Sequence, residues 1–401
     1  MALSRRVGTV AALGSAQTLA WASSYYLPAM LAAPMARELG VSTPTVFAAF
    51  SLALIVSALL GPYAGRTIDR FGGRPVLIGT NVIFALGLAA LGMAKGSWSL
   101  FVAWIVIGVG MGSGLYEAAF AALVRLYGRD SRSVITGITL IAGFASTVGW
   151  PLTTLLEGQI GWRGACFAWA ALHLVIGVPL NWSLPRASPL AVAAPTATTV
   201  GSGSTRGAQR TAYILAFVFA ATWFISTAMA AHLPMLLQAG GASLATAVAV
   251  GALIGPAQVA ARLLEFGVLR RVHPLLSARL ASLMHPVGAT LLALFGVPAA
   301  AVFAILHGAG NGILTIAKGT LPLVFFGPQG YGERQGLLTV PARVAQALSP
   351  WLFGIFLDRW GANAMWISAA IGLLAFAALL MLPSPVEQGE SLEVPLRGAA
   401  E

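Results

Sequence analysis

Charged residues are scarce in this chain. Only 9% of its 401 residues are Asp, Glu, Lys or Arg, whereas 58% are hydrophobic. Soluble globular proteins carry about a quarter charged residues, because their surfaces face water. The shortage therefore excludes an ordinary soluble globule and indicates that much of the surface faces the lipid bilayer.

Residues and motifs that support enzyme chemistry are also missing. Cys166 is the only cysteine, which excludes an internal disulfide framework and any multi-cysteine metal site. The sequence has no His-Glu-x-x-His run of a zinc protease and no Gly-x-x-x-x-Gly-Lys-Ser/Thr run of an ATPase. We therefore expect no enzyme activity, no cofactor and no metal, and any uphill work must draw on a gradient. A membrane enzyme or a sensor is the alternative class, although no soluble sensory domain is evident.

Long apolar runs occupy most of the sequence. About twenty apolar residues are needed to cross the hydrocarbon core of a bilayer. Residues 185–211, rich in Ala, Pro, Thr, Gly and Ser, indicate a flexible cytoplasmic linker, and 383–401 indicate a disordered cytoplasmic tail. We expect an all-α membrane protein with a six-helix bundle at 1–184 and another at 212–382. The twelve predicted spans are 9–33, 44–66, 75–95, 98–126, 132–157, 163–184, 212–237, 243–268, 275–297, 299–326, 333–357 and 361–382.

The net charge of +11 is unevenly distributed between these spans. With the N-terminus inside the cell, inner segments hold sixteen of the 23 Lys and Arg residues, and outer segments hold four. Positively charged loops stay on the cytoplasmic side of membrane helices. The basic excess therefore needs no nucleic-acid partner. It predicts a multi-pass protein of the bacterial inner membrane with both termini in the cytoplasm.

The two halves carry similar glycine and proline motifs at a spacing of about 200 residues. Each motif falls in the same helix of a six-helix half, which indicates a parallel internal repeat. We expect glycines to let helices approach closely and prolines within spans to bend them. The matches are Tyr26-Leu27-Pro28 with His232-Leu233-Pro234, Gly110, Gly112 and Gly114 with Gly308, Gly310 and Gly312, and Gly137 and Pro151 with Gly336 and Pro350.

A charged turn between the second and third spans is the most informative segment. It reads Gly65-Arg66-Thr67-Ile68-Asp69-Arg70-Phe71-Gly72-Gly73-Arg74. Gly72 and Gly73 permit the positive backbone angles that a sharp turn needs, and Asp69 can hydrogen-bond nearby helix ends. The pattern Gly-x-x-x-Asp-Arg-x-Gly-x-Arg resembles the signature loop of Major Facilitator Superfamily transporters. An ordinary positive cytoplasmic turn is the alternative.

This resemblance implies the fold of that superfamily, in which two six-helix bundles rock about a solute site near the membrane midplane. It also implies a role in conformational switching for Gly65, Asp69, Arg70, Gly72 and Arg74. The second half has no copy of the turn that retains the aspartate.

Two arginines lie inside spans of the second half, Arg262 in the eighth and Arg343 in the eleventh. A charge within hydrocarbon is costly, so it faces water or a partner. Two guanidinium groups facing one cavity can hold a carboxylate. Their positions resemble those of the basic residues that hold the anion in monocarboxylate porters and the oxalate–formate antiporter, although Gln258 stands where the porters have an aspartate. Arg262 could instead reach the interface or pair with Glu265.

Two further side chains are candidates for proton coupling. Glu117 in the fourth span can load and release a proton as its surroundings alternate between wet and dry. His232 in the seventh span changes charge near neutral pH. The alternatives are a structural ion pair between Glu117 and a base such as Arg125 or Arg132, and a packing role for His232.

Aromatic and amide side chains complete the predicted solute site. We expect Tyr26, Trp223 and Asn311 to contact the solute and aromatic faces to form an apolar wall. His307 could line the cavity one turn from Asn311, and Lys318 could either reach the interface or face the cavity.

These features predict a monomeric secondary transporter that works by alternating access and uses protons or another ion gradient. The favoured solute is a small organic anion such as a monocarboxylate. Arg343 and Arg262 would bind the anion, and Glu117 or His232 would bind the proton. Proton-exchange efflux of drugs or toxic compounds, and uptake of a neutral nutrient such as a vitamin, are the alternatives.

Overall fold

The chain is almost entirely helical. Among the described residues, the computed structural model contains helices and turns and no strand. The predicted linker at 185–211 lies largely outside the described residues, and the predicted tail at 383–401 lies outside them after its first residue. The described residues are 2–127, 131–186, 206–267, 272–326 and 331–383.

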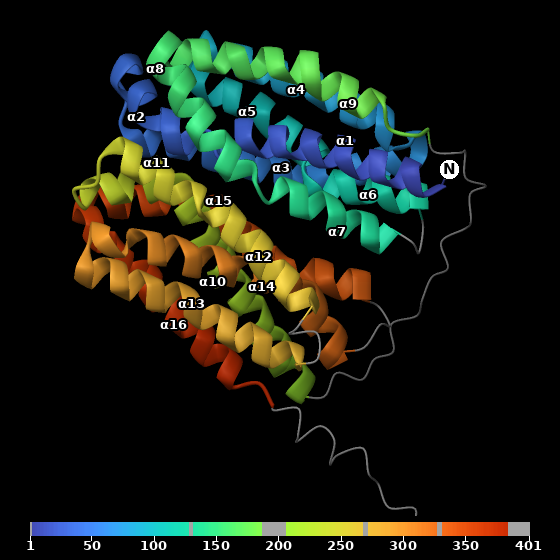
Figure 1. Ribbon diagram of the computed structural model, residues 1–401, viewed down its shortest axis with the longest axis vertical. Coiled ribbons are helices and arrows are strands. Elements are labelled where there is room, and N and C mark those ends of the chain that lie inside the picture. Colours follow the sequence, from blue (N-terminus) through green and yellow to red (C-terminus); the bar gives the residue numbers. More distant parts are fainter. Residues whose placement is uncertain (1, 128–130, 187–205, 268–271, 327–330, 384–401) are drawn as a thin grey trace, which may run out of the picture.

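Helices α1 to α9 form an N-terminal bundle, which lies beside a C-terminal bundle of α10 to α16 (Figure 1). The N-terminal bundle contains α1 (Ala2–Ser23), α2 (Pro28–Leu39), α3 (Thr43–Phe71), α4 (Gly73–Gly92), α5 (Ser97–Gly114), α6 (Tyr116–Tyr127), α7 (Ser131–Ala142), α8 (Ala145–Leu172), the π-helical turn η2 (His173–Gly177) and α9 (Val178–Trp182). The C-terminal bundle contains α10 (Arg206–Ala239), α11 (Leu244–Ala252), α12 (Ile254–Gly267), α13 (Pro274–Phe295), η4 (Val297–Ala299), α14 (Ala300–Phe326), α15 (Tyr331–Trp360), η5 (Gly361–Asn363) and α16 (Ala364–Leu380).

Nine segments of the described chain are long and apolar enough to cross a membrane. Two of them contain 49 and 44 residues, more than twice the roughly 20 residues that one crossing needs. Each of these turns back once, at Gly161 with φ 70° and at Gly361 with φ 55°. The nine segments therefore make eleven crossings, and α1 with α2 makes the first. The twelve-span fold expected from the sequence is confirmed.

Four crossings that the sequence predicted as continuous helices are interrupted. The interruptions follow Ser23, Gly114, Ala142 and Ala252. In contrast, α15 continues through both of its prolines. Proline alone therefore does not decide where a crossing breaks.

Hydrogen bonds donated by other helices account for two of the interruptions. The backbone after Gly114 is extended, and the Gln17 side-chain amide donates to the Gly114 carbonyl at 2.7 Å. Pro256 has no backbone N–H, so the carbonyl of Ala252, four residues earlier, has no helical donor. That carbonyl accepts a hydrogen bond from the Thr147 hydroxyl on α8 at 2.9 Å. Both free carbonyls thus find a partner on another helix.

The glycine repeat is aligned differently from the prediction. A β-carbon on Gly108 would lie 2.6 Å from a backbone oxygen of α3, and one on Gly308 would lie 2.7 Å from a backbone oxygen of α12. These glycines therefore make the same close helix contact in the two bundles. The equivalent sets are Gly108, Gly110 and Gly112 in the first half and Gly308, Gly310 and Gly312 in the second, so the predicted pairing was wrong by two residues.

A polar anchor joins the ends of α2 and α4 to the Gly161 turn. The Glu38 carboxylate accepts hydrogen bonds from Arg163 Nε at 2.7 Å and from Trp162 Nε1 at 2.5 Å. Arg163 Nη1 also donates to the carbonyls of Gly92 and Ala94, at 2.8 and 2.7 Å. The hydrogen bond from Arg163, followed by that from Trp162, holds the pKa of Glu38 below its ordinary value of 4.5.

We expect this anchor to lose its stabilising effect in acid. A carboxyl whose pKa is lowered on folding stabilises the folded state above its unfolded pKa, and this contribution disappears as the pH falls through the folded value. The melting temperature of the protein in detergent should therefore fall more steeply below about pH 4.5 in the wild type than in Glu38→Gln. Glu157→Gln, at a carboxyl that forms no ion pair with the described residues, should follow the wild type. Equal slopes for wild type and Glu38→Gln would contradict this account.

The two bundles pack against each other through α3 with α15, α8 with α11 and α12, and α2 with α10. Both α2 and α11 lie at the end of the molecule opposite the N-terminus (Figure 1). We call the contact on that side the inter-bundle seam. Its hydrogen bonds join Tyr25 Oη to Thr227 Oγ1 at 2.7 Å, the Trp351 backbone N–H to Ser51 Oγ at 3.3 Å, and Thr147 Oγ1 to the Ala252 carbonyl at 2.9 Å.

Candidate transport site between the bundles

The residues predicted to bind the anion and the proton form an ion pair between the bundles. Arg343 Nη2 on α15 lies 2.9 Å from Glu117 Oε1 on α6. Their side chains are 42% and 61% exposed, although both residues lie inside membrane-spanning segments. Charges that are so exposed within a span face water or a protein cavity rather than hydrocarbon. The pair therefore marks a water-accessible position between the bundles.

The interruption after Gly114 positions Glu117. Because α6 begins at Tyr116, Glu117 lies in the first turn of a twelve-residue helix. The dipole of that helix favours a negative charge at its N-terminus. Gly114 itself is packed so closely against Thr80 that a β-carbon would overlap the threonine side chain. The glycine thus permits the close packing at which the span bends and Glu117 turns toward α15.

Arg262 also contacts the N-terminal bundle. Its Nη1 donates a hydrogen bond to the Thr139 carbonyl oxygen on α7 at 2.9 Å. Since α7 ends at Ala142, this carbonyl lies in the last turn, at the negative end of the helix dipole. Both predicted arginines therefore contact the N-terminal bundle, Arg343 at Glu117 and Arg262 at Thr139.

Aromatic rings lie beside this charged position. The Trp21 ring centroid is 4.9 Å from that of Tyr116 and 5.0 Å from that of Tyr25. Tyr26, a predicted solute contact, packs edge-on against Trp150 with ring centroids 5.8 Å apart. The rings pack against one another at this place, whereas an apolar wall around a solute, and a contact between Tyr26 and a solute, remain predictions.

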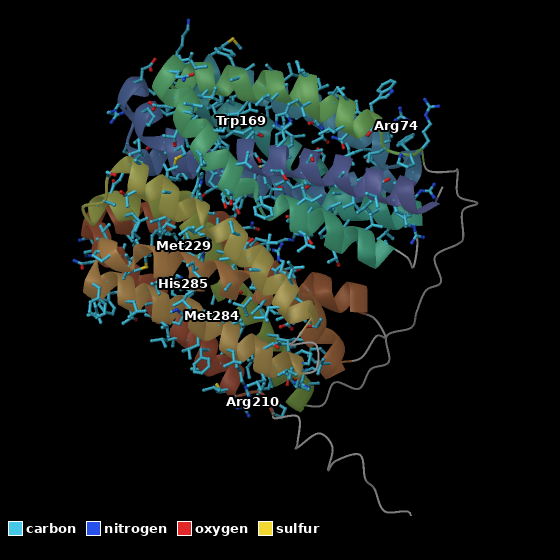
Figure 2. All side chains as sticks on the ribbon, in the orientation of Figure 1. Arg74, Trp169, Arg210, Met229, Met284 and His285 are labelled. Carbon is cyan, nitrogen blue, oxygen red and sulfur yellow. The ribbon has the colours of Figure 1, made fainter. Side chains whose placement is uncertain are left out.

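The other two predicted solute contacts lie in the C-terminal bundle. Lys318 Nζ lies 4.2 Å from the centroid of the Trp223 ring, in cation–π geometry. Asn311 lines a small cavity with His285 and His307, whose Nδ1 atoms are 2.9 Å apart. Residues of α10, α13, α14 and α16 enclose this cavity, and Figure 2 shows His285 inside the C-terminal bundle. The solute roles of Trp223 and Asn311 remain predictions.

His232, the second proton candidate, lies in the inter-bundle seam. Its ring is fully buried and its centroid is 3.9 Å from that of Phe47 on α3. Its Nε2 atom lies 2.7 Å from the Pro350 carbonyl oxygen on α15. Along α15 that carbonyl is seven residues from Arg343, about 10 Å of helix. The structure therefore separates the two proton candidates.

The predicted switch turn is a single residue, Gly72, between α3 and α4. Gly72 has φ 83°, as the sequence predicted. Gly73 does not have a positive φ, so that part of the expectation was wrong. Instead, Gly73 lies against α6, where a β-carbon would overlap that of Ala122. The second glycine serves helix packing rather than the turn.

The arginines of this turn contact aromatic rings. Arg70 lies 5.1 Å from the centroid of Phe71, and Arg74 lies 5.0 Å from that of Trp182. Figure 2 shows Arg74 at the end of the molecule where the N-terminus lies. Gly65 lies within α3 beside open space. The Asp69 side chain is outside the described residues, so the switching role of this turn remains a prediction.

We expect the Gly73 contact to be required for close packing of α4 on α6. Gly73→Ala should destabilise the folded protein by about 1–3 kcal/mol, because the new methyl group has no room. Ala122→Gly, combined with Gly73→Ala, should restore part of the loss, because the α-carbon at position 122 would still lie 2.9 Å from the added carbon. Gly79→Ala, on the same helix with nothing within 4 Å of the added carbon, is the matched control. Thermal unfolding in detergent gives the melting temperatures of the wild type, the double variant and the two single glycine variants. Equal melting temperatures for Gly73→Ala and Gly79→Ala would show that the contact of Gly73 with α6 is not required.

Sequence reasoning missed several partners at this interface. The Arg262 acceptor is the Thr139 carbonyl, and the Tyr25 partner is the Thr227 hydroxyl. Neutral groups of this kind are unremarkable in a membrane helix, so composition does not reveal them. One partner could have been anticipated from the sequence. Pro256 leaves the Ala252 carbonyl without a helical donor, and in the structure this carbonyl accepts a hydrogen bond across the inter-bundle seam.

Comparison with known proteins identifies the family. A sequence model described as Major Facilitator Superfamily matches residues 13–295, more than half of the chain. The chain belongs to the Major Facilitator Superfamily. It is therefore a multi-pass membrane transporter, as the signature turn indicated. The crystal structure of a D-xylose–proton symporter shares the fold, with a TM-score of 0.73, 14% identity, and coverage of 94% of this chain and 98% of that one.

Relatives of this transporter have diverse descriptions. A 38 kDa protein encoded in a 23S RNA operon of Thermoproteus tenax is 28% identical over 90% of this chain and 91% of its own length. A multidrug resistance protein of Klebsiella pneumoniae is 30% identical over 37% of each chain. Monocarboxylate transporter 14 of Mus musculus is 30% identical over 31% of this chain and 24% of its own length. The last two matches span well under half of either protein.

Proposed function

We propose that this transporter moves a small organic anion, such as a monocarboxylate, together with a proton. The observation that carries the proposal is the ion pair between Arg343 and Glu117, at 2.9 Å, with one partner in each bundle. A guanidinium group binds a carboxylate by paired hydrogen bonds. In the structure Glu117 is the carboxylate bound to Arg343, so it occupies the position that a substrate carboxylate would take.

Proton binding and anion binding support each other in this arrangement. A proton on Glu117 removes its negative charge and weakens its hold on Arg343. The released guanidinium then attracts the substrate anion, and the bound anion in turn favours the protonated form of Glu117. The two affinities must change by the same factor, because the coupling free energy is shared. One proton and one monoanion therefore cross together without net charge.

The same exchange can control the movement of the bundles. While Glu117 and Arg343 are paired, the N-terminal and C-terminal bundles are tied at this point. Loading with both a proton and an anion replaces the tie by contacts within the C-terminal bundle. A proton alone leaves an unpaired arginine, and an anion alone places two carboxylates at one guanidinium. Both partial states are costly once the bundles close over the site and exclude water, which would oppose leakage of either species.

The similarity to a monocarboxylate transporter supports an anionic substrate. The basic inner segments support an orientation with both termini in the cytoplasm, for a protein of the bacterial inner membrane. We propose that it works as a monomer.

Efflux of drugs by proton exchange is the second candidate. It is favoured by the multidrug resistance relative and by the cluster of Tyr116, Trp21, Tyr25 and Tyr26, whose faces could hold an aromatic compound. Among the described residues, no specific contact favours uptake of a neutral nutrient.

Transport assays in proteoliposomes test the proposal. With an imposed inward proton gradient, we expect a small carboxylate to accumulate and to carry protons with it. A panel of monocarboxylates, neutral vitamins and cationic aromatic drugs separates the candidates. Proton-driven movement of a drug in the opposite direction, with no carboxylate transported, would establish the efflux function instead.

A further inference from the structure

His232 is enclosed by both bundles. Its ring centroid lies 3.9 Å from that of Phe47 in the N-terminal bundle and 5.6 Å from that of Phe353 in the C-terminal bundle. On α15, a β-carbon at Gly354 would lie only 3.3 Å from His232 Cε1. The side chain is fully buried. Closing the seam therefore places this imidazole in a close-fitting, largely apolar slot.

The hydrogen bonds of the slot suit only the neutral ring. A carbonyl oxygen can only accept, so His232 Nε2 carries the hydrogen that bonds Pro350 at 2.7 Å. The other nitrogen, Nδ1, is buried and has no hydrogen-bond partner among the described residues. In the neutral ring this atom is a single unused acceptor. A proton there would add a charge and a second N–H donor without an acceptor, which is costly in an apolar slot.

Within the part of the chain that the structure describes, no charged side chain pairs with this imidazole. The elements packed around His232 carry titratable side chains, but none of those described forms a hydrogen bond or an ion pair with the imidazole. These are Arg37 and Glu38 on α2, Tyr63, Arg66 and Arg70 on α3, Arg210 and Tyr213 on α10, and Arg343, Asp358 and Arg359 on α15.

We propose that His232 is a proton-binding site that controls the inter-bundle seam. The bundles close over the neutral imidazole, and a proton bound while the seam is open keeps them apart. Alternating access requires the bundles to separate on this side, and separation removes Phe47 and admits water to Nδ1. The site depends on alternating access alone, whatever solute is carried. With both termini in the cytoplasm, the seam faces outward, so external acid favours the outward-open state.

The size of the effect follows from linkage. A water-exposed histidine titrates near pH 6.5, whereas the closed seam excludes the proton. Between pH 7.5 and pH 5.5 the ratio of open to closed protein should then rise by about tenfold. Spin labels across the seam can measure this ratio in the full-length protein. Lys95 and Arg359 are exposed, lie in different bundles, and can be replaced by cysteine after Cys166→Ser, since Cys166 is the only native cysteine.

Double electron–electron resonance in nanodiscs should show a longer distance gaining population at pH 5.5. His232→Gln, which keeps a donor for Pro350, and His232→Phe, which keeps the ring, should both lose the pH dependence. His273→Gln, at the N-cap of α13, should retain it. Distance distributions that are the same at both pH values would overturn the proposal, and so would a pH dependence that persists in either folded His232 variant.

Discussion

Replacement of Arg343 by alanine should abolish anion binding while leaving the protein folded. The Arg343 side chain is 42% exposed and fills no core position, so its removal leaves no cavity. Alanine also maintains the helix of α15. A bidentate guanidinium–carboxylate contact contributes about 3 kcal/mol, which corresponds to a loss of affinity of at least 100-fold. Titration of the purified variant with the carboxylate identified by the transport panel measures this loss.

Two matched arginine variants make the result specific. Arg343→Lys retains the charge but not the planar fork of donors, so we expect an intermediate loss of affinity. Arg359→Ala, near the end of the same helix, should bind like the wild type. If Arg343→Ala binds the carboxylate as the wild type does, Arg343 is not part of the solute site. The ion pair with Glu117 would then be a structural tie only.

The sequence was sufficient to predict the number of crossings and the family, because both depend on patterns that repeat along the chain. Hydrophobic length defines a span wherever it occurs. The turn at Gly72 combines a fixed charge pattern with a residue that accepts φ 83°. Neither feature requires knowledge of which helices are neighbours.

The interruptions of the spans were not predictable in the same way. The break after Gly114 depends on an amide from Gln17, and the two residues are 97 positions apart. Hydropathy is unchanged across such a break, so a periodic pattern does not reveal it. The position of Glu117 at a helix N-terminus follows from this contact, and so does its direction toward α15. A contact between residues far apart in the sequence therefore determines where Glu117 lies, and hydrophobic patterns do not show such contacts.

The charged candidates differed from the histidine candidate in how well the sequence predicted their surroundings. Arg343 and Glu117 were expected near water because a charge in a span is costly, and they are among the exposed residues. A neutral histidine does not carry the free-energy cost of a buried charge, so this cost did not predict where His232 would lie. The structure buries it between Phe47 and Phe353 instead.

Replacement of Glu117 by glutamine should uncouple anion binding from protons. Glutamine resembles the protonated carboxyl and cannot hold Arg343 by charge, so the variant should bind the anion at any pH. In the wild type, affinity should rise as the pH falls, by up to tenfold per pH unit where the free protein holds Glu117 ionised. In Glu117→Gln this slope should vanish. Exchange of labelled for unlabelled anion should persist, whereas accumulation driven by a proton gradient should be lost.

The Glu117 variant also separates the two proposed proton sites. Glu117→Gln removes the pH dependence of anion affinity but leaves His232 to respond to acid at the seam. His232→Gln does the reverse, because the Pro350 carbonyl is seven residues along α15 from Arg343. Glu157→Gln, a carboxyl on α8, should change neither measurement. Proton-driven accumulation of the anion at the wild-type level in Glu117→Gln would remove Glu117 from the coupling step, since no other described carboxylate is paired with Arg343.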